Sequence, residues 1–139
     1  MNNFEAQILT PEGSVFDDQV TGVQVPGALG SFEIKTLHAS IISTLKTGRI
    51  LVRKADGGEQ YFAVSGGFVE VHDNKLTLLA EAAEPVDKID IERARAAKER
   101  AKERLESDKD SIDKERARKA LERAENRIKL AANFSVTTQ

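Results

Sequence analysis

Glu84-Pro-Val-Asp-Lys-Ile-Asp-Ile-Glu-Arg-Ala94 is the stretch where this chain of 139 residues changes character. Before it, the sequence holds six of the seven aromatic residues and frequent glycines. After it, alanine, glutamate, lysine and arginine recur at helical spacing. The proline in this stretch disfavours a helix in the residue before it, and Asp87 and Asp90 can each cap the helix that follows. We therefore expect two domains, residues 1–84 and 85–139.

The composition excludes several classes of protein. The chain has no cysteine, which excludes a disulfide framework and thiolate chemistry. It has no apolar run of about 18 residues, the length that indicates a membrane-spanning helix. The N-terminal Met-Asn-Asn-Phe lacks the basic and apolar regions of a signal peptide. These features predict a cytosolic or membrane-peripheral protein.

Charge is distributed unevenly. Residues 87–130 carry 15 basic and 12 acidic residues, whereas the remainder of the chain has a net charge of −5. Mixed charge of this density is typical of a solvated helix pair, or of a surface that docks reversibly on an acidic partner. Acidic residues interrupt the basic ones throughout, which argues against a nucleic-acid footprint.

The first domain shows a strand pattern. Strands are predicted at 3–9, 14–20, 22–25, 32–34, 49–54, 60–65, 68–72 and 76–80, while the apolar run 37–45 stays unassigned. Turns are predicted at Thr10-Pro-Glu-Gly13, Asp56-Gly-Gly58 and Asp73-Asn74. Eight or more short strands indicate an antiparallel β-sandwich or flattened barrel, within an α+β fold.

The second domain is predicted to be an antiparallel two-helix hairpin, divided near Glu106–Ser111, with Asp110 or Ser111 capping the second helix. Its expected seam comprises Ile91, Ala94, Ala97, Ala101 and Leu105 on one helix, and Ala117, Leu121, Ala124, Ile128 and Ala131 on the other. A buried methylene contributes about 0.8 kcal/mol, whereas ordering one residue's backbone costs about 1–2 kcal/mol. We therefore expect a hairpin that opens easily; the alternative is a permanently docked one.

No pattern indicates catalysis. His38 and His72 are the only histidines, and neither has the spacing of a metal site. Ser65-Gly66-Gly67 lacks the strand–turn–helix context of a nucleophile elbow, and no phosphate-binding Gly-rich loop is present. We expect neither an enzyme nor a metal site.

Four arginines form the best candidate site. Arg93 and Arg100 are seven residues apart on one helix, and Arg123 and Arg127 are four apart on the other. In an antiparallel hairpin all four can surround one anion, and the guanidinium fork suits phosphate. The alternative is a solvated, salt-bridged face.

Several motifs together resemble one family, the epsilon subunit of the F-type ATP synthase. These are Thr10-Pro-Glu-Gly13, Val64-Ser-Gly-Gly-Phe-Val-Glu-Val71, Leu78-Leu-Ala-Glu-Ala-Ala-Glu84 and Ile89-Asp-Ile-Glu-Arg-Ala94. The resemblance covers nearly the whole chain. It departs from the family's pattern at Ile34–Ile41, which keeps His38 but lacks the usual prolines and glycine.

The resemblance implies a non-catalytic rotor component. The sandwich would bind the gamma subunit, with His38 at the contact, and the ring of c subunits. The hairpin would permit turnover when folded down. When extended it would climb along the gamma subunit and block hydrolysis, meeting the catalytic alpha and beta subunits through Arg116, Arg118, Lys119, Arg123 and Arg127. The complex would place the chain at the cytoplasmic face of the bacterial plasma membrane, as a peripheral protein.

The resemblance also implies a regulatory ATP site, with no cofactor required for any reaction. Its residues, carried over by position, would be Glu84, Ile89, Asp90, Arg93, Ala94, Arg100, Arg123 and Arg127. Two other functions remain open on the residues alone: a nucleotide-sensing module that works by itself, and a structural adaptor.

Overall fold

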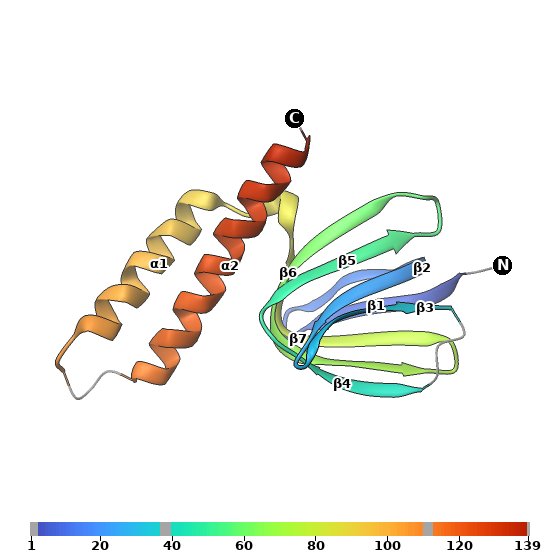
Figure 1. The fold of residues 1–139 in the computed structure, drawn as a ribbon, viewed down its shortest axis with the longest axis horizontal. Coiled ribbons are helices and arrows are strands. Elements are labelled where there is room, and N and C mark those ends of the chain that lie inside the picture. The colour runs from blue at the N-terminus through green and yellow to red at the C-terminus, as the bar shows by residue number, and fades with distance from the viewer. Residues whose placement is uncertain (1–2, 37–39, 110–112, 139) are drawn as a thin grey trace. The chain divides into compact units, whose positions relative to one another are not determined.

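A computed structural model describes residues 3–36, 40–109 and 113–138 (Figure 1). The chain divides into two compact units, residues 1–85 and residues 86–139. The first unit consists of strands, and the second of helices.

The described part of the first unit holds seven strands. They are β1 (Phe4–Thr10), β2 (Gly13–Gly27), β3 (Gly30–Lys35), β4 (Ile41–Leu45), β5 (Gly48–Lys54), β6 (Glu59–His72) and β7 (Lys75–Pro85). The expectation of eight or more strands was wrong, because two pairs of short strands are in fact continuous. Residues 14–20 and 22–25 both belong to β2, and residues 60–65 and 68–72 both belong to β6.

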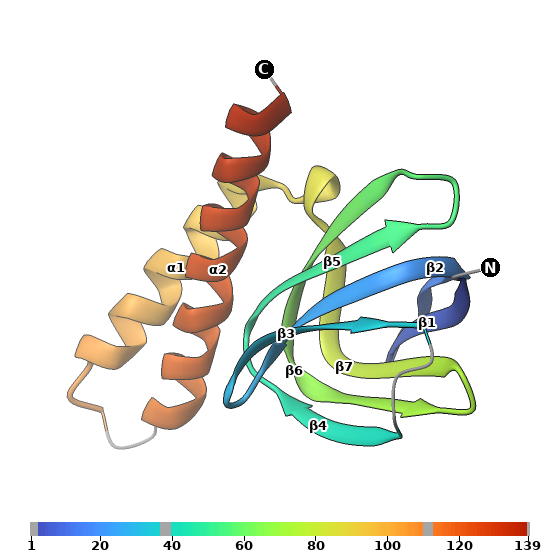
Figure 2. The same cartoon turned by 45° about the vertical axis from the view of Figure 1, so that its right-hand side comes forward.

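The sheet is mixed, although most of its pairs are antiparallel. β1 pairs with β7 in parallel, Glu5 opposite Lys75 and Leu9 opposite Leu79. The strands also pair as β7–β6, β6–β5, β5–β2 and β2–β1, so the pairing closes on itself. Figure 2 shows the strands curving around a shared interior. The predicted sandwich or flattened barrel is therefore confirmed, with one parallel pair that the antiparallel description omitted.

A hydrophobic cluster drawn from all seven strands fills this interior. Phe62 on β6 is completely buried and meets Phe16 of β2 edge to face, with 6.0 Å between ring centroids. On β6, Phe62 and Val64 face the core, and beyond the glycines Val69 and Val71 do so. The inward face thus changes from even to odd positions across Gly66 and Gly67, as expected where a strand turns a corner of a sandwich.

Gly67 has a strict steric reason to be glycine. Its φ is +122°, and a Cβ built there would lie 2.0 Å from the carbonyl oxygen of Leu79 and 2.8 Å from the Cα of Ala80. Both neighbours are backbone atoms of β7 and cannot move aside as a side chain can. The corner of β6 therefore depends on close approach of two backbones.

The second unit contains a short 3₁₀ turn, η1 (Val86–Lys88), followed by α1 (Ile91–Glu106) and α2 (Lys114–Thr138). Figure 1 shows α1 and α2 as a hairpin, as predicted. None of the helices among the described residues is long and apolar enough to cross a lipid bilayer.

An aspartate immediately before each helix caps its first turn. Asp90 caps α1, as one of the two predicted candidates, by accepting a hydrogen bond from the backbone N–H of Arg93. At α2 the cap is Asp113, whose Oδ1 accepts from the backbone N–H of Arg116 at 3.1 Å. Asp110 and Ser111, the expected caps of the second helix, lie outside the described residues.

The predicted seam of small side chains is confirmed at five of its six alanines, and the sixth, Ala97, is half-buried. Ala94 and Ala101 of α1 are buried, and so are the alanines that recur every seven residues on α2: Ala117, Ala124 and Ala131. The larger seam residues are only half-buried: Ile91, Leu105, Leu121 and Ile128. The seam is therefore narrow, and it buries mostly methyl groups.

Candidate functional site

The start of α1 brings four of the predicted site residues together. Ile89 and Asp90 immediately precede the helix, and Arg93 and Ala94 lie in its first turn. The Asp90 carboxylate is engaged by the Arg93 backbone, whereas the Arg93 side chain is exposed. Ala94 is completely buried, and Ile89 is half-buried. Any ligand here therefore meets an exposed guanidinium beside a capped helix start.

The four arginines lie on one face of the hairpin. Arg93, Arg100 and Arg123 each precede a buried seam alanine by one residue. Because α1 and α2 run in opposite directions, the residue before a seam alanine lies on the same flank in both helices. Arg127 follows Ala124 by three residues, which places it on that flank too.

Two of the four, Arg93 and Arg127, also lie at matching heights along the hairpin, and the other two lie nearer the loop. With a rise of about 1.5 Å per residue, Arg93 and Arg127 each lie about 20 Å from the loop end of their own helix. Arg100 and Arg123 lie about 9 and about 14 Å from it on the same basis. Arg93 and Arg100 are exposed, whereas Arg123 and Arg127 are half-buried. The predicted convergence of four guanidinium groups is thus compatible with the backbone, and an anion between the helices fits their charge.

Two other predicted residues do not belong to the hairpin. Glu84 belongs to the first unit, where it pairs with Ala63 across β7 and β6 and is half-buried. His38, the predicted contact for the gamma subunit, lies outside the described residues.

The remaining basic residues of the prediction occupy the start of α2. Arg116, Arg118 and Lys119 are all exposed. Arg118 forms an ion pair with Glu115 on the same helix. Exposed pairs of this kind contribute little stability, so these side chains are available for a partner surface.

The sandwich carries an apolar surface that was not predicted from the sequence. Ile42, Phe68 and Leu79 are 74%, 41% and 39% exposed. Phe68 pairs with Leu79 across β6 and β7, and Ile42 lies on the neighbouring strand β4, opposite Glu70. We call these three residues the apolar surface. Phe68 points away from the core, whereas its neighbours Val69 and Val71 point into it. Apolar residues on both faces of this strand were the sequence signal that could have revealed the surface.

A fourth exposed apolar side chain lies close to the apolar surface. Leu29 occupies the turn between β2 and β3 and is fully exposed. An open recess of ≈ 580 Å³ is lined by Leu29, Phe32 and Ile42, among others. Exposed apolar groups that gather in this way mark interaction sites more often than isolated ones do.

A charged network covers another part of the sandwich. Arg53 of β5 donates to Glu33 of β3 at 3.0 Å and also to Glu59 of β6. The hydrogen bond and the charge of Glu33 raise the pKa of Arg53 above its ordinary value. Arg49, on the same strand, lies 5.3 Å above the ring of Tyr61. These contacts join β5 to its neighbour β6 and, across β2, to β3.

Comparison with known proteins matches both units. Residues 3–86 match the family described as "ATP synthase, Delta/Epsilon chain, beta-sandwich domain", and residues 87–132 match its "long alpha-helix domain". The solved structures show the same fold. A chain of the Euglena gracilis mitochondrial ATP synthase has a TM-score of 0.76 at 19% identity, covering 96% of this chain and 81% of that one. A chain of the Tetrahymena thermophila central stalk and c-ring has a TM-score of 0.54 at 17% identity, covering 94% of each.

Relatives with higher identity are bacterial. The ATP synthase epsilon chain of Protochlamydia amoebophila is 46% identical over 104 residues, which is 75% of this chain and 71% of the relative. That of Alkalihalophilus pseudofirmus is 45% identical over 109 residues, covering 78% and 81%. The chain belongs to the family of ATP synthase epsilon chains.

Proposed function

We propose that this chain is a non-catalytic subunit of the central stalk of an F-type ATP synthase, which couples the gamma subunit to the ring of c subunits. The observation that carries the proposal is the match of both family domains, in order, over residues 3–132. Its location follows from the complex: a peripheral protein at the cytoplasmic face of a bacterial plasma membrane.

The sandwich supplies the binding surface for the rotor. The apolar surface of Ile42, Phe68 and Leu79 lies on three neighbouring strands, and Leu29 projects from the adjoining recess. Apolar side chains held on a rigid sheet can be buried by a partner at little cost in conformational entropy. These residues support a role for the sandwich in holding the gamma subunit and the c ring.

The hairpin supplies the regulatory part. Its seam buries alanine methyl groups, and each methyl-sized group contributes about 0.8 kcal/mol. The helices therefore hold each other weakly enough to exchange between a folded and an extended arrangement. In the extended arrangement the exposed Arg116, Arg118 and Lys119, together with Arg123 and Arg127, would contact acidic surface on the catalytic alpha and beta subunits.

ATP is the proposed ligand of the folded hairpin. Arg93, Arg100, Arg123 and Arg127 share one face, which suits the phosphates. Glu84, Ile89, Asp90 and Ala94 complete the proposed site. A nucleotide that bridges α1 and α2 would favour the folded arrangement by mass action.

Removal of the hairpin tests its proposed regulatory role. Deletion of residues 88–139 is expected to raise ATP hydrolysis by the assembled enzyme, because the inhibitory arm is gone, while assembly with the gamma subunit stays intact. Unchanged hydrolysis with normal assembly would contradict an inhibitory role. Failure of the full chain to copurify with gamma would contradict the stalk assignment itself.

Calorimetric titration tests the nucleotide site separately. Arg93→Ala with Arg127→Ala is expected to abolish the heat of ATP binding to the full chain. The matched control is Arg95→Ala with Lys102→Ala, which removes the same charge from the opposite flank of α1. Equal heats in both double variants, or no heat with the wild-type chain, would refute the ATP site.

A further inference from the structure

Lys114, the first residue of α2, reaches back to the end of α1. Its Nζ donates to the backbone carbonyls of Arg104 at 3.0 Å and Leu105 at 2.7 Å, and also to that of Ser107. The side chain is half-buried. One ammonium group therefore joins the two helices through three hydrogen bonds.

The acceptors are groups that a helix leaves unsatisfied. The last four carbonyls of an α-helix have no partner within the helix, and α1 ends at Glu106. The carbonyl oxygen of Arg104 accepts a hydrogen bond from the backbone N–H of Ser107 at 3.3 Å. The Nζ of Lys114 donates to this oxygen as well, and to the carbonyl oxygen of Leu105. The same ammonium lies at the negative end of the α1 dipole, where positive charge is favoured.

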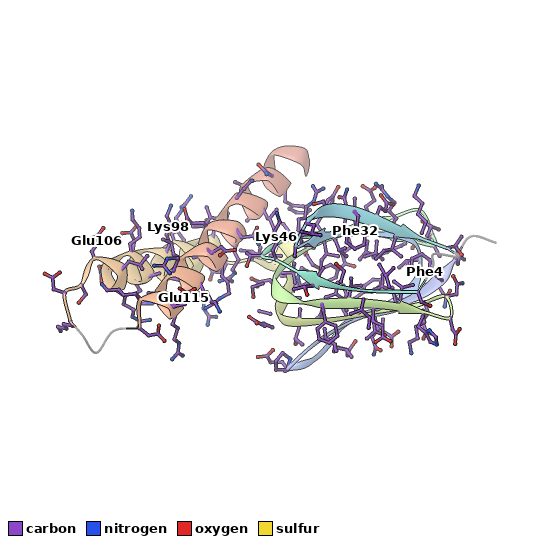
Figure 3. All side chains as sticks on the ribbon, turned by 60° about the horizontal axis from the view of Figure 1, so that its bottom comes forward. Phe4, Phe32, Lys46, Lys98, Glu106 and Glu115 are labelled. Atoms are coloured by element: carbon purple, nitrogen blue, oxygen red, sulfur yellow. The ribbon has the colours of Figure 1, made fainter. Side chains whose placement is uncertain are left out.

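Acidic residues increase the importance of this lysine. Glu106, Asp108 and Asp113 occupy the same junction and are all exposed, and Figure 3 labels Glu106 and Glu115 at this end of the hairpin. Negative charge at a helix C-terminus is unfavourable. The Lys114 ammonium and Arg104, the basic residue in the last turn of α1, offset this unfavourable charge.

Two ion pairs of the hairpin each lie within a single helix. The ion pair of Arg95 with Glu92 lies within α1, and that of Arg118 with Glu115 lies within α2. The seam between the helices is formed mainly by alanines, which bury little area. The charge-assisted contact of Lys114 with the end of α1 therefore adds to the weak hold of the alanine seam.

We propose that Lys114 is a clasp that holds the folded hairpin, and that its release from the α1 carbonyls is a required step when the helices separate. This inference rests on the proposed function, because it assumes that the hairpin has an extended state. The clasp acts at the loop end, whereas the arginine face lies farther along the helices. Nucleotide and clasp therefore stabilise the folded hairpin independently.

The test measures the distance between α1 and α2 in the full chain. The sequence has no cysteine, so spin labels can be placed solely at Glu99→Cys and Glu122→Cys, both on exposed positions. Lys114→Met removes the donors but keeps the alkyl stem and a similar helix propensity. We expect the ratio of separated to folded hairpins to rise about tenfold, which corresponds to about 1.4 kcal/mol.

The matched control is Lys129→Met, an exposed lysine on the same helix, which is expected to keep the wild-type distance distribution. Circular dichroism checks that helical content is retained. If Lys114→Met loses helix, Lys114→Gln replaces it, since glutamine also has a helix propensity close to that of lysine. A Lys114 variant that keeps its helices and has the same distances as Lys129→Met would overturn the clasp.

Hydrolysis by the assembled enzyme separates this inference from the proposed function. If Lys114→Met opens the hairpin but hydrolysis changes neither with it nor with the deletion of residues 88–139, the clasp is supported and the inhibitory arm is rejected. If the deletion raises hydrolysis but Lys114→Met leaves the distances unchanged, the arm is supported and the clasp is rejected.

Discussion

The Oδ1 of Asp90 accepts a hydrogen bond from the backbone N–H of Arg93 at 3.1 Å. Both residues belong to the proposed ATP site, and this contact also starts α1. A substitution at Asp90 therefore acts on the helix as well as on any ligand. The two effects can be separated, because capping needs only a short side-chain oxygen acceptor.

We expect Asp90→Ala to destabilise the helical unit by about 1 kcal/mol, the usual cost of losing an N-cap. Asp90→Ser keeps an acceptor and is expected to cost much less. Amide hydrogen exchange in the first turn of α1 measures this difference. Equal protection in the two variants would show that the hydrogen bond does not hold the helix start. ATP binding that survives Asp90→Ser would restrict Asp90 to capping.

Gly67→Ala is expected to destabilise the sandwich by more than about 3 kcal/mol, because the new Cβ meets backbone atoms of β7 in addition to adopting a positive φ. Gly57→Ala is the control. Its φ is +95°, yet a Cβ there meets no atom within 4 Å, so it is expected to cost only about 1–2 kcal/mol of backbone strain. Fluorescence of Tyr61, the single tyrosine in a chain without tryptophan, follows unfolding in denaturant. Similar losses in both variants would contradict the steric argument.

Arg53→Met is expected to lower the melting temperature of the sandwich slightly, and more so at low salt, because the ion pair with Glu33 is partly exposed. The pKa of Arg53 is raised in the folded state. The stability it contributes is therefore complete below the unfolded-state pKa and is lost only as pH rises through the higher folded value. The difference between wild type and variant should stay constant from about pH 6 to about pH 9, far below an arginine pKa. A difference that shrinks across this range would contradict the assignment.

Ile42→Ser with Phe68→Ser is expected to weaken capture of the gamma subunit by at least about tenfold, since central apolar side chains dominate binding energy. Both side chains are largely or partly exposed, so thermal stability should change little. The control is Asp17→Ser with Gln19→Ser, at exposed positions of β2, which should bind as the wild type does. Equal capture by the two double variants would exclude the apolar surface from the rotor contact.

Periodic features were predictable from the sequence. The alanine seam, the hairpin and the Asp90 cap depend on residues a few positions apart, and the structure confirms them. The four-arginine face belongs to the same class, because helix spacing alone fixes which flank a residue occupies. Whether it binds ATP is still a prediction.

Features that depend on distant pairing were not predictable. Nothing local in Phe4–Thr10 indicates that it lies parallel to β7. Residues 60–65 and 68–72 were predicted as separate strands joined by a turn or bulge, whereas Gly66 and Gly67 allow one long strand to turn a corner. The apolar surface requires the register of β4, β6 and β7, and the reach of Lys114 requires the helix ends to be in place.

The parallel pairing of β1 with β7 has a consequence for synthesis of the chain. The parallel partner of β1 begins only at Lys75. The sheet therefore cannot close until β7 has been synthesised. Until then β1 can pair only with β2, and apolar side chains destined for the interior stay open to association with other chains. The helices come after β7 in the chain and leave the ribosome after it, so the sandwich is expected to complete its folding at about the time that the hairpin emerges.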